Sequence, residues 1–265
     1  MMTDSRPVGL YSIGLSGLDV TEVLTVCAEH QVPFVHLRGG PRGYHLAGRD
    51  RATLSRWARH AQRSTPVTLV TADLDLAQFR QPGSEEYGHV CTELGRLAEA
   101  TAIFGVTAIR LMGHHQPGGP DGGSVIVPDL QHRYGIVTLV ELHDPRWFTS
   151  AALTILEPIL HANPGLGLLL DSGQVHRAWC HLGSLHAPVL AALVRHARVV
   201  HWSDSGHGLD GAGHRLLAAA TRTCAGDGVE FGFEWTGPDR SATTCLARYR
   251  SAVSWRQATR TEQPS

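Results

Sequence analysis

The chain has 265 residues, with 23 Lys and Arg against 24 Asp and Glu and a formal net charge of −1 at pH 7. A chain so close to neutrality has no global basic field to attract nucleic acid, which disfavours a DNA- or RNA-binding function. No stretch reaches the ~18 apolar residues of a membrane span, and the opening MMTDSRP lacks the apolar run of a signal peptide. The five cysteines are scattered without a CxxC pair, as is usual for free thiols in a reducing compartment. We therefore expect a soluble, cytoplasmic protein.

Apolar runs typical of buried strands alternate with amphipathic segments typical of helices along the whole chain. The predicted strands are Val8–Gly14, Pro33–Gly40, Pro66–Asp75, Ala108–Met112, Ile136–Glu141, Gly165–Asp171, Arg198–Asp204 and Val229–Trp235. The predicted helices cover residues 19–30, 49–62, 84–104, 149–162, a segment that includes 189–194, residues 212–224 and residues 242–255.

Eight strand–helix units of about 31 residues each predict a single α/β domain, a (β/α)8 TIM barrel over residues 1–255. A disordered polar tail is expected over residues 256–265. A doubly wound open sheet is the rival architecture, but no GxGxxG follows the first strand.

Acidic and imidazole side chains lie at the ends of the last four predicted strands. Glu141, Asp171, His201 and Glu234 are separated by 30, 30 and 33 positions, each close to one strand–helix unit. Equivalent ends of barrel strands meet at one rim, where barrel enzymes have their active sites, so these side chains can converge. For each of them, a solvated loop position is the alternative interpretation.

Two glutamates, an aspartate and a histidine make an oxygen-rich site with one borderline ligand. Such a set suits Mn²⁺, Zn²⁺, Co²⁺, Fe²⁺ or Mg²⁺ rather than copper or a thiolate-bound metal. Without a cation, buried carboxylates would repel one another, so a bound divalent metal would explain why these side chains are brought together.

These motifs resemble the xylose isomerase-like barrel superfamily of sugar phosphate isomerases, epimerases and related metal enzymes. The similarity is greatest over residues 138–174, which contain ELHD and PGLGLLLDSGQ, and it continues through VVHWSDS, GAGHRLL and FEW. The first 130 residues resemble the family only in their layout.

The resemblance implies a divalent metal held by Glu141, Asp171, His201 and Glu234, with Glu141 and Glu234 also acting as acid and base. The implied reaction is isomerisation or epimerisation of a small polyhydroxy carbonyl compound, by proton abstraction next to a metal-bound carbonyl.

The chain departs from the family at Gln174, three residues after Asp171, where many members have a histidine. Glutamine can bind substrate but cannot shuttle protons at neutral pH. His176 would lie on the other side of a strand that continued past Asp171. Further candidates for substrate binding are His143, Arg38 and His207, each with an ordinary structural alternative: a loop histidine, a salt bridge and a solvent-exposed side chain.

Other functions remain open at this point. A metal-dependent lyase, such as a dehydratase of keto-inositol or dehydroshikimate type, would use the same ligands, and a barrel without catalysis could bind a ligand or a partner. A homo-oligomer is also open, because the exposed helices of such barrels often pair. A nuclease resembling the related apurinic-site endonucleases would have to recruit His114, His115, Asp210 and His214, and the neutral charge disfavours it. Arg110 and the loop His114–Gly123 could form a lid, or the loop could be a simple connector.

Overall fold

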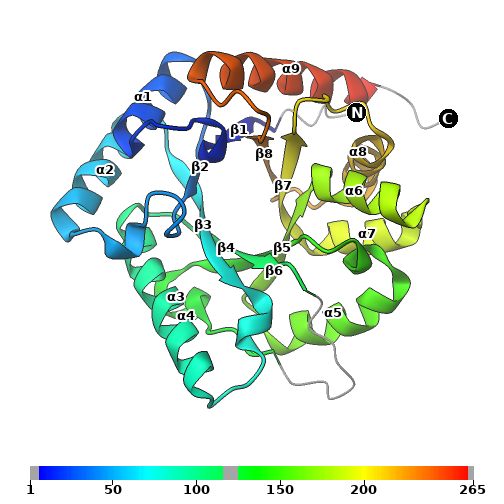
Figure 1. Ribbon diagram of the computed structural model, residues 1–265, viewed down its shortest axis with the longest axis horizontal. Helices are drawn as coiled ribbons and strands as arrows, with labels where there is room; N and C mark the ends of the chain where they lie inside the picture. The colour runs from blue at the N-terminus through cyan, green and yellow to red at the C-terminus, as the bar shows by residue number, and fades with distance from the viewer. Residues whose placement is uncertain (1–5, 116–124, 262–265) are drawn as a thin grey trace.

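In the computed structural model, eight parallel strands close into a barrel in the order β1 to β8, and helices surround it (Figure 1). The structure describes residues 6–115 and 125–261. The strands are β1 (Val8–Tyr11), β2 (Val35–Arg38), β3 (Val67–Asp75), β4 (Ala108–Gly113), β5 (Val137–Leu142), β6 (Leu166–Asp171), β7 (Ala197–Asp204) and β8 (Glu230–Trp235). The closed order confirms the (β/α)8 barrel and excludes the doubly wound sheet, which would have two free edges.

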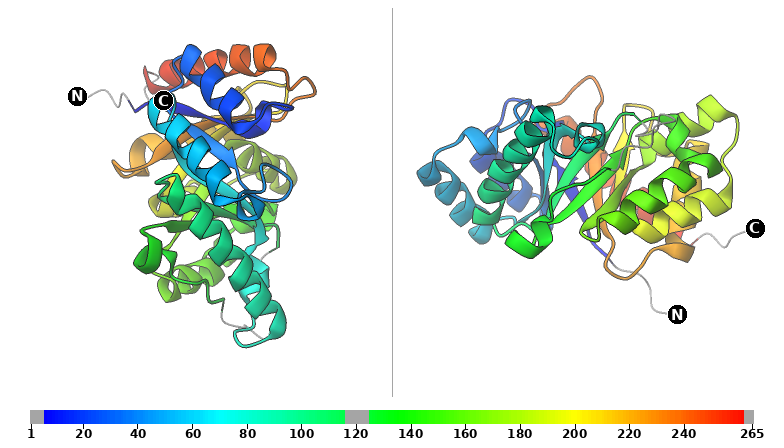
Figure 2. Two further views of the ribbon diagram at one scale, coloured as in Figure 1. Left: turned by 90° about the vertical axis from the view of Figure 1, so that its left-hand side faces the viewer. Right: turned by 90° about the horizontal axis from the view of Figure 1, so that it is seen from below.

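Helices follow the strands and form the outer layer of the barrel (Figure 2). The α-helices are α1 (Val20–Glu29), α2 (Arg51–Arg63), α3 (Glu85–Ile103), α4 (Leu130–Tyr134), α5 (Ser150–Ala162), α6 (Ser172–Leu182), α7 (Ala187–His196), α8 (Ala212–Cys224) and α9 (Ala242–Thr261). Short 3₁₀ turns are η1 (Ser12–Gly14), η2 (Leu46–Gly48), η3 (Leu76–Phe79) and η4 (Pro145–Phe148).

Side-chain caps explain why several helices begin where they do. Asp19 forms a capping box with Glu22 at the start of α1, and Asp50, Ser84 and Thr149 accept a backbone N–H in the first turn of α2, α3 and α5. Each cap satisfies an N–H group that has no partner within the helix, an interaction typically worth about 1 kcal/mol.

The apolar core has two parts. A large cluster fills the space between the strands and the helices, whereas the barrel interior holds only a small cluster of Leu69, Leu139, Leu169 and Val199. Buried polar side chains accompany this cluster: Tyr11, His36, Arg110, Glu141 and His201. Two of them, Glu141 and His201, belong to the candidate site.

The chain between β6 and β7 and the C-terminal segment differ from expectation. The strand does not continue past Asp171, because α6 begins at Ser172, so Gln174 and His176 are helical. Helix α9 extends to Thr261, so residues 256–261 are not a disordered tail. Arg256 anchors this last part, since its guanidinium lies 3.8 Å from the centre of the Phe231 ring. Residues 262–265 lie outside the described residues.

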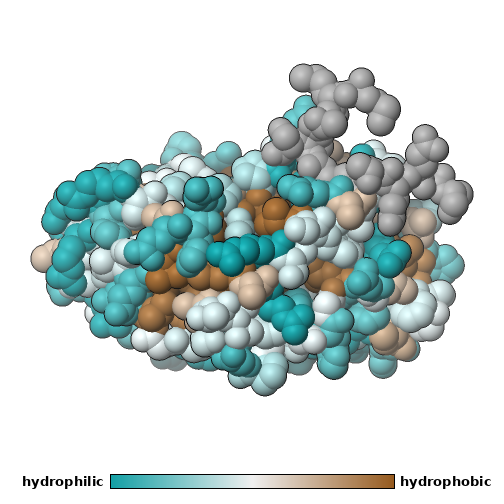
Figure 3. Space-filling view, turned by 90° about the horizontal axis from the view of Figure 1, so that it is seen from above, coloured by the Kyte–Doolittle hydropathy of each residue, from teal (hydrophilic) through white to brown (hydrophobic). Residues whose placement is uncertain are grey.

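On the face shown in Figure 3, hydrophobic side chains are visible between stretches of hydrophilic ones. Within residues 6–115 and 125–261, no helix is long and apolar enough to cross a membrane. All five cysteines are free, and they range from buried Cys27 and Cys245 to exposed Cys180.

Candidate metal centre and active site

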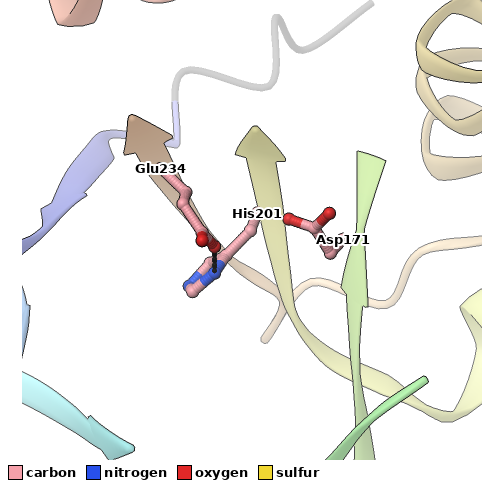
Figure 4. Close-up of side chains that lie close together, drawn as sticks. All are labelled: Asp171, His201 and Glu234. Atoms are coloured by element: carbon pink, nitrogen blue, oxygen red, sulfur yellow. Dashed lines mark hydrogen bonds and ion pairs between the residues drawn. The ribbon is translucent and has the colours of Figure 1, made fainter. Parts of the chain in front are cut away.

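Three of the four predicted ligands form a compact group at the carboxyl ends of neighbouring strands. Asp171 of β6, His201 of β7 and Glu234 of β8 each offer one ligand atom, and these atoms all lie within 4.8 Å of one another. Figure 4 shows the three side chains on adjacent strands, with the Glu234 carboxylate against the His201 ring. The pairing of Asp171 with His201 in the sheet register explains why residues far apart in sequence meet here.

Hydrogen bonds on both carboxylate oxygens hold Asp171 in place. Oδ1 accepts the backbone N–H of Gln174 at 2.9 Å, which makes Asp171 the N-cap of α6, and Oδ2 accepts the hydroxyl of Ser203. The backbone N–H of Ser203 in turn donates to Oγ of Ser172 at 2.9 Å. A carboxylate has about four lone-pair sites, so a cation can still bind Asp171.

The charges around the group favour a cation. Burial raises the pKa of Asp171 well above its ordinary value, and the nearby charges of Glu234 and Glu141 raise it further. Burial and Glu141 raise the pKa of Glu234 to about 7. The surrounding side chains therefore do not fully neutralise the negative charges of Asp171 and Glu234, and a bound divalent cation would neutralise them. With the ligand spacing, this donor set fits a hard or borderline divalent metal.

His201 is suited to be a neutral ligand. It is fully buried, and burial together with neighbouring His36 lowers its pKa well below the ordinary value. Nδ1 faces Glu234, with its Oε2 at 3.3 Å, while Nε2 lies 2.7 Å from Nδ1 of His36. A ring nitrogen facing the acidic pair and a partner behind the ring are the usual surroundings of a metal-binding histidine.

Glu141, the fourth predicted ligand, is engaged differently. It lies on β5 with 3% of its surface exposed, and Oε2 is 2.9 Å from Nε of buried Arg110. Burial alone would raise the pKa of Glu141, but Arg110 and then His143 more than offset this, so the pKa falls below its usual value. Glu141 is not a member of the three-residue group, so its place among the metal ligands stays a prediction.

Arg110 lies inside the barrel. Nη1 donates to the carbonyl of Ala72 at 3.3 Å and Nη2 to the hydroxyl of Tyr11 at 3.4 Å, and that hydroxyl lies 2.9 Å from Oγ1 of Thr71. Its contact with Glu141 is an ion pair rather than a well-aligned hydrogen bond. A buried guanidinium is costly unless it is paired, so Arg110 and Glu141 depend on each other.

A cavity of about 430 Å³ opens beside the three-residue group. Asp171 and Glu234 line one part of it, and Gln174, His176 and His207 line the part formed by α6 and the segment between β7 and α8. Gln174 is 9% exposed and its Oε1 has no hydrogen-bond partner among the described residues. A buried acceptor without a partner at a cavity wall is suited to bind a ligand hydroxyl.

The remaining predicted residues lie in different surroundings. His143 follows β5, and its Nε2 is 3.3 Å from Oε1 of Glu141, while its ring centre is 4.5 Å from that of His114. Arg38 closes β2 and is partly buried, but it is not among the residues described here that line the cavity. The predicted lid cannot be followed, since most of the loop His114–Gly123 lies outside the described residues.

Sequence reasoning missed two interior side chains that support the site, His36 and Glu230, and it considered Arg110 only as a candidate for a lid, with a simple connector as the alternative. A signal was present in the sequence: His36 and Arg110 each interrupt a buried apolar strand, VHLR and AIRLMG. A polar residue within such a run predicts an inward position in the barrel, but strand phase alone does not say which partner it meets.

His214 carries a prediction about acid stability. It is 5% exposed, and burial and then His176 lower its pKa from 6.5 to about 4. Between these values the unfolded chain binds a proton that the folded chain does not, so stability falls as the pH drops from about 6.5 to 4, by about 3 kcal/mol at most.

Urea unfolding of the wild type and His214→Phe across this range checks the effect. The variant is expected to show a flatter dependence of the free energy of unfolding on pH, because phenylalanine cannot take up a proton. His186→Phe, at an exposed position, serves as the control. An unchanged slope in His214→Phe would contradict the prediction.

No family model and no curated protein sequence matches the chain. Solved structures do match. The IolI protein with a bound zinc atom has a TM-score of 0.73 at 15% identity, covering 97% of this chain and 100% of its own. D-psicose 3-epimerase with D-fructose has a TM-score of 0.71 at 10% identity, with coverages of 97% and 100%. A xylose isomerase domain protein from Salmonella typhimurium has a TM-score of 0.65 at 16% identity, with coverages of 97% and 99%.

At these identities the likeness concerns the fold, and it extends over nearly the whole length of both chains. The first 130 residues, which resembled the family only in layout, are included in it. The chain therefore has the fold of the xylose isomerase-like barrels, as its strand-end motifs predicted.

Proposed function

We propose that the protein is a divalent-metal-dependent isomerase or epimerase of a small polyhydroxy carbonyl compound. The observation that carries the proposal is the group of Asp171, His201 and Glu234 at the carboxyl rim, beside a cavity large enough for a sugar. Structural neighbours that include a zinc-bound protein and an epimerase crystallised with D-fructose support this direction.

Asp171, His201 and Glu234 would hold the metal, with Glu141 as the fourth ligand that the sequence predicts. A bound divalent cation supplies Lewis-acid polarisation of the substrate carbonyl. The protein contributes the positions of the ligands: hydrogen bonds to both oxygens fix Asp171, and His36 supports His201 from behind. Mn²⁺, Zn²⁺, Co²⁺, Fe²⁺ and Mg²⁺ all suit this set.

Glu141 and Glu234 are the acid/base pair in this proposal. They lie close enough for the charge of one to affect the pKa of the other. Arg110 keeps Glu141 ionised, so its carboxylate can accept a proton at neutral pH. One glutamate would remove the proton next to the carbonyl, and the other would return it to the substrate.

Gln174, His143 and His207 would contact the substrate hydroxyls. Gln174 has a free carbonyl oxygen, and His207 lines the same cavity. Neither His143 nor Arg38 is among the described residues that line this cavity, but Nε2 of His143 lies 3.3 Å from Oε1 of Glu141, which makes Arg38 the weaker candidate. The dehydratase alternative gains no support from the neighbours, since none of the three described above is named as a lyase.

Proton exchange at carbon tests the reaction type. Incubating the protein with Mn²⁺ and a panel of keto- and aldo-sugars in D₂O is expected to introduce deuterium next to the carbonyl of the substrate, detected by ¹H NMR. Asp171→Asn, which weakens the metal site, should abolish the exchange. Loss of water without exchange into recovered substrate would point to a lyase, and no reaction with any sugar to a barrel that only binds.

Metal content tests the cofactor. Protein purified without chelator is expected to hold about one divalent ion per chain by elemental analysis, and Asp171→Asn or Glu234→Gln to hold far less, because each removes an anionic ligand. Glu157→Gln, on the exposed side of α5, is the control. A wild type that takes up neither Mn²⁺ nor Zn²⁺ would overturn the metal proposal.

A further inference from the structure

Two buried imidazoles meet inside the barrel beneath the candidate metal centre. His36 of β2 and His201 of β7 are 165 positions apart in sequence, yet both are fully buried and their ring centres lie 4.9 Å apart, with an interplanar angle of 26°. Nδ1 of His36 is 2.7 Å from Nε2 of His201, which is hydrogen-bonding distance.

The pair continues to a carboxylate near the other end of the barrel. Nε2 of His36 lies 2.7 Å from Oε1 of Glu230, the first residue of β8, and that oxygen also accepts the hydroxyl of Thr68 at 2.8 Å. Glu230, His36 and His201 thus form one hydrogen-bonded chain that leads from the barrel interior to the metal-facing nitrogen.

The barrel wall makes room for this chain. A Cβ on Gly232 would lie 2.8 Å from the His36 ring and 3.1 Å from the His201 ring, closer than an ordinary van der Waals contact. Gly232 pairs directly with His201 in the sheet register. Glycine, which has no side chain, therefore occupies the position where the two rings need the space.

Hydrogen-bond complementarity along the chain determines where the protons lie when both histidines are neutral. An ionised carboxylate can only accept, so His36 must carry its proton on Nε2 to bond with Glu230. Its Nδ1 is then a lone pair, so Nε2 of His201 must be the donor between the rings. The remaining nitrogen of His201, Nδ1, is left without a proton and faces Glu234.

We propose that Glu230 and His36 are positioning residues that hold His201 in the Nε2–H tautomer, so that its Nδ1 is a ready metal ligand before the metal arrives. The inference rests on the proposed metal site, but it makes a statement about the metal-free protein. A histidine in the other tautomer would have to lose a proton from Nδ1 before it could bind a cation.

Long-range ¹H–¹⁵N NMR of the metal-free, ¹⁵N-labelled protein at neutral pH tests the tautomer directly. His201→Asn and His36→Gln, each of which deletes one set of ring signals, assign the two rings among the 17 histidines. Both rings are expected to show a protonated Nε2 and a bare Nδ1. A protonated Nδ1 on either ring, which includes a charged His36, would overturn the proposal whatever the protein does with metals.

Metal affinity, measured by competition with a chromophoric chelator, tests the consequence. His36→Leu leaves the buried Nε2–H of His201 without an acceptor. This favours the His201 tautomer whose Nδ1–H donates to Glu234, so the affinity for the metal should fall by about 10–100-fold. His36→Gln can still accept from Nε2–H through its amide oxygen and should restore most of the affinity. His60→Leu, at a partly buried site on α2, is the control.

The outcomes separate the two proposals. A wild type that binds no divalent metal would remove the proposed function, while the NMR spectrum still decides the tautomer. A wild type that binds metal, with His36→Leu binding as tightly, would remove this inference and leave the function in place. If His36→Leu does not fold, the spectra of the wild type and His36→Gln still decide it.

Discussion

Replacing Glu234 by glutamine is expected to lower proton exchange on the substrate by about 10²–10⁴-fold or more while the barrel stays folded. The change removes an acid/base group and an anionic metal ligand together. It also removes a buried charge whose pKa burial and Glu141 raise to about 7, so the free energy of unfolding should stay the same or increase. Exchange rates by NMR and urea unfolding, both at pH 7.5, measure the two effects.

Glu157→Gln is the matched control for this experiment, because it makes the same chemical change on an exposed helix face. Repeating the Glu234→Gln assay at rising Mn²⁺ concentration separates the two roles. Recovery of exchange at high Mn²⁺ would show that Glu234 acts only as a ligand. Full activity at ordinary Mn²⁺ would contradict both roles.

Replacing Arg110 by methionine is expected to reduce the free energy of unfolding by about 3–5 kcal/mol at pH 7, because it leaves buried Glu141 without its counterion. The guanidinium is buried and holds Glu141, Tyr11 and the Ala72 carbonyl at once. Exchange activity should also fall, since Glu141 would no longer be held ionised. Urea unfolding at several pH values measures the loss.

The free energy of unfolding of the two proteins should depend differently on pH. In the wild type the pKa of Glu141 lies below its ordinary 4.5, so its stabilising contribution is present above pH 4.5 and is lost as the pH falls through the folded value. In Arg110→Met, burial without a counterion should raise the pKa of Glu141. The difference in the free energy of unfolding between the variant and the wild type should then become smaller as the pH is lowered, because Glu141 is protonated more readily in the variant.

Arg146→Met provides the comparison. Arg146 pairs with Asp144 at 2.5 Å, but the Arg146 side chain is 64% exposed and its charge is screened by solvent, so its loss should cost far less stability than the loss of Arg110. The double variant Arg110→Met/Glu141→Leu should recover much of the stability, since an apolar pair replaces the ion pair. Equal losses in the two single arginine variants would contradict the role of Arg110 as the buried counterion.

The strand ends were predictable because a barrel repeats one unit. Asp171, His201 and Glu234 each lie at or near the carboxyl end of an apolar strand at nearly equal spacing, and parallel strands bring such ends to one rim. The same logic did not predict the surroundings of Glu141. Its partner, Arg110, comes from a neighbouring strand, and its place within AIRLMG predicts an inward side chain but not that this side chain meets Glu141.

Local pattern also misjudged two helix boundaries. Asp171 ends β6 and caps α6 at once, so the segment that contains Gln174 and His176 turns immediately into helix and brings both to the cavity. The polar residues after Trp255 remain helical because Arg256 packs on Phe231 and donates to the carbonyl of Arg6, contacts with the start of the chain and with β8.

The sequence by itself determined the barrel, the number and order of its strands, and the rim where acid and imidazole groups gather, because those features follow from periodicity and repeat length. Only the tertiary structure decided which polar side chains meet inside the barrel. Arg110 with Glu141 is a contact between the neighbouring strands β4 and β5, whereas Glu230 with His36 and His201 joins β8 to β2 and β7; both are set by strand tilt and register around a closed sheet. No local pattern encodes them, and the contacts of His36 with Glu230 and His201 form only when β8 closes on β1.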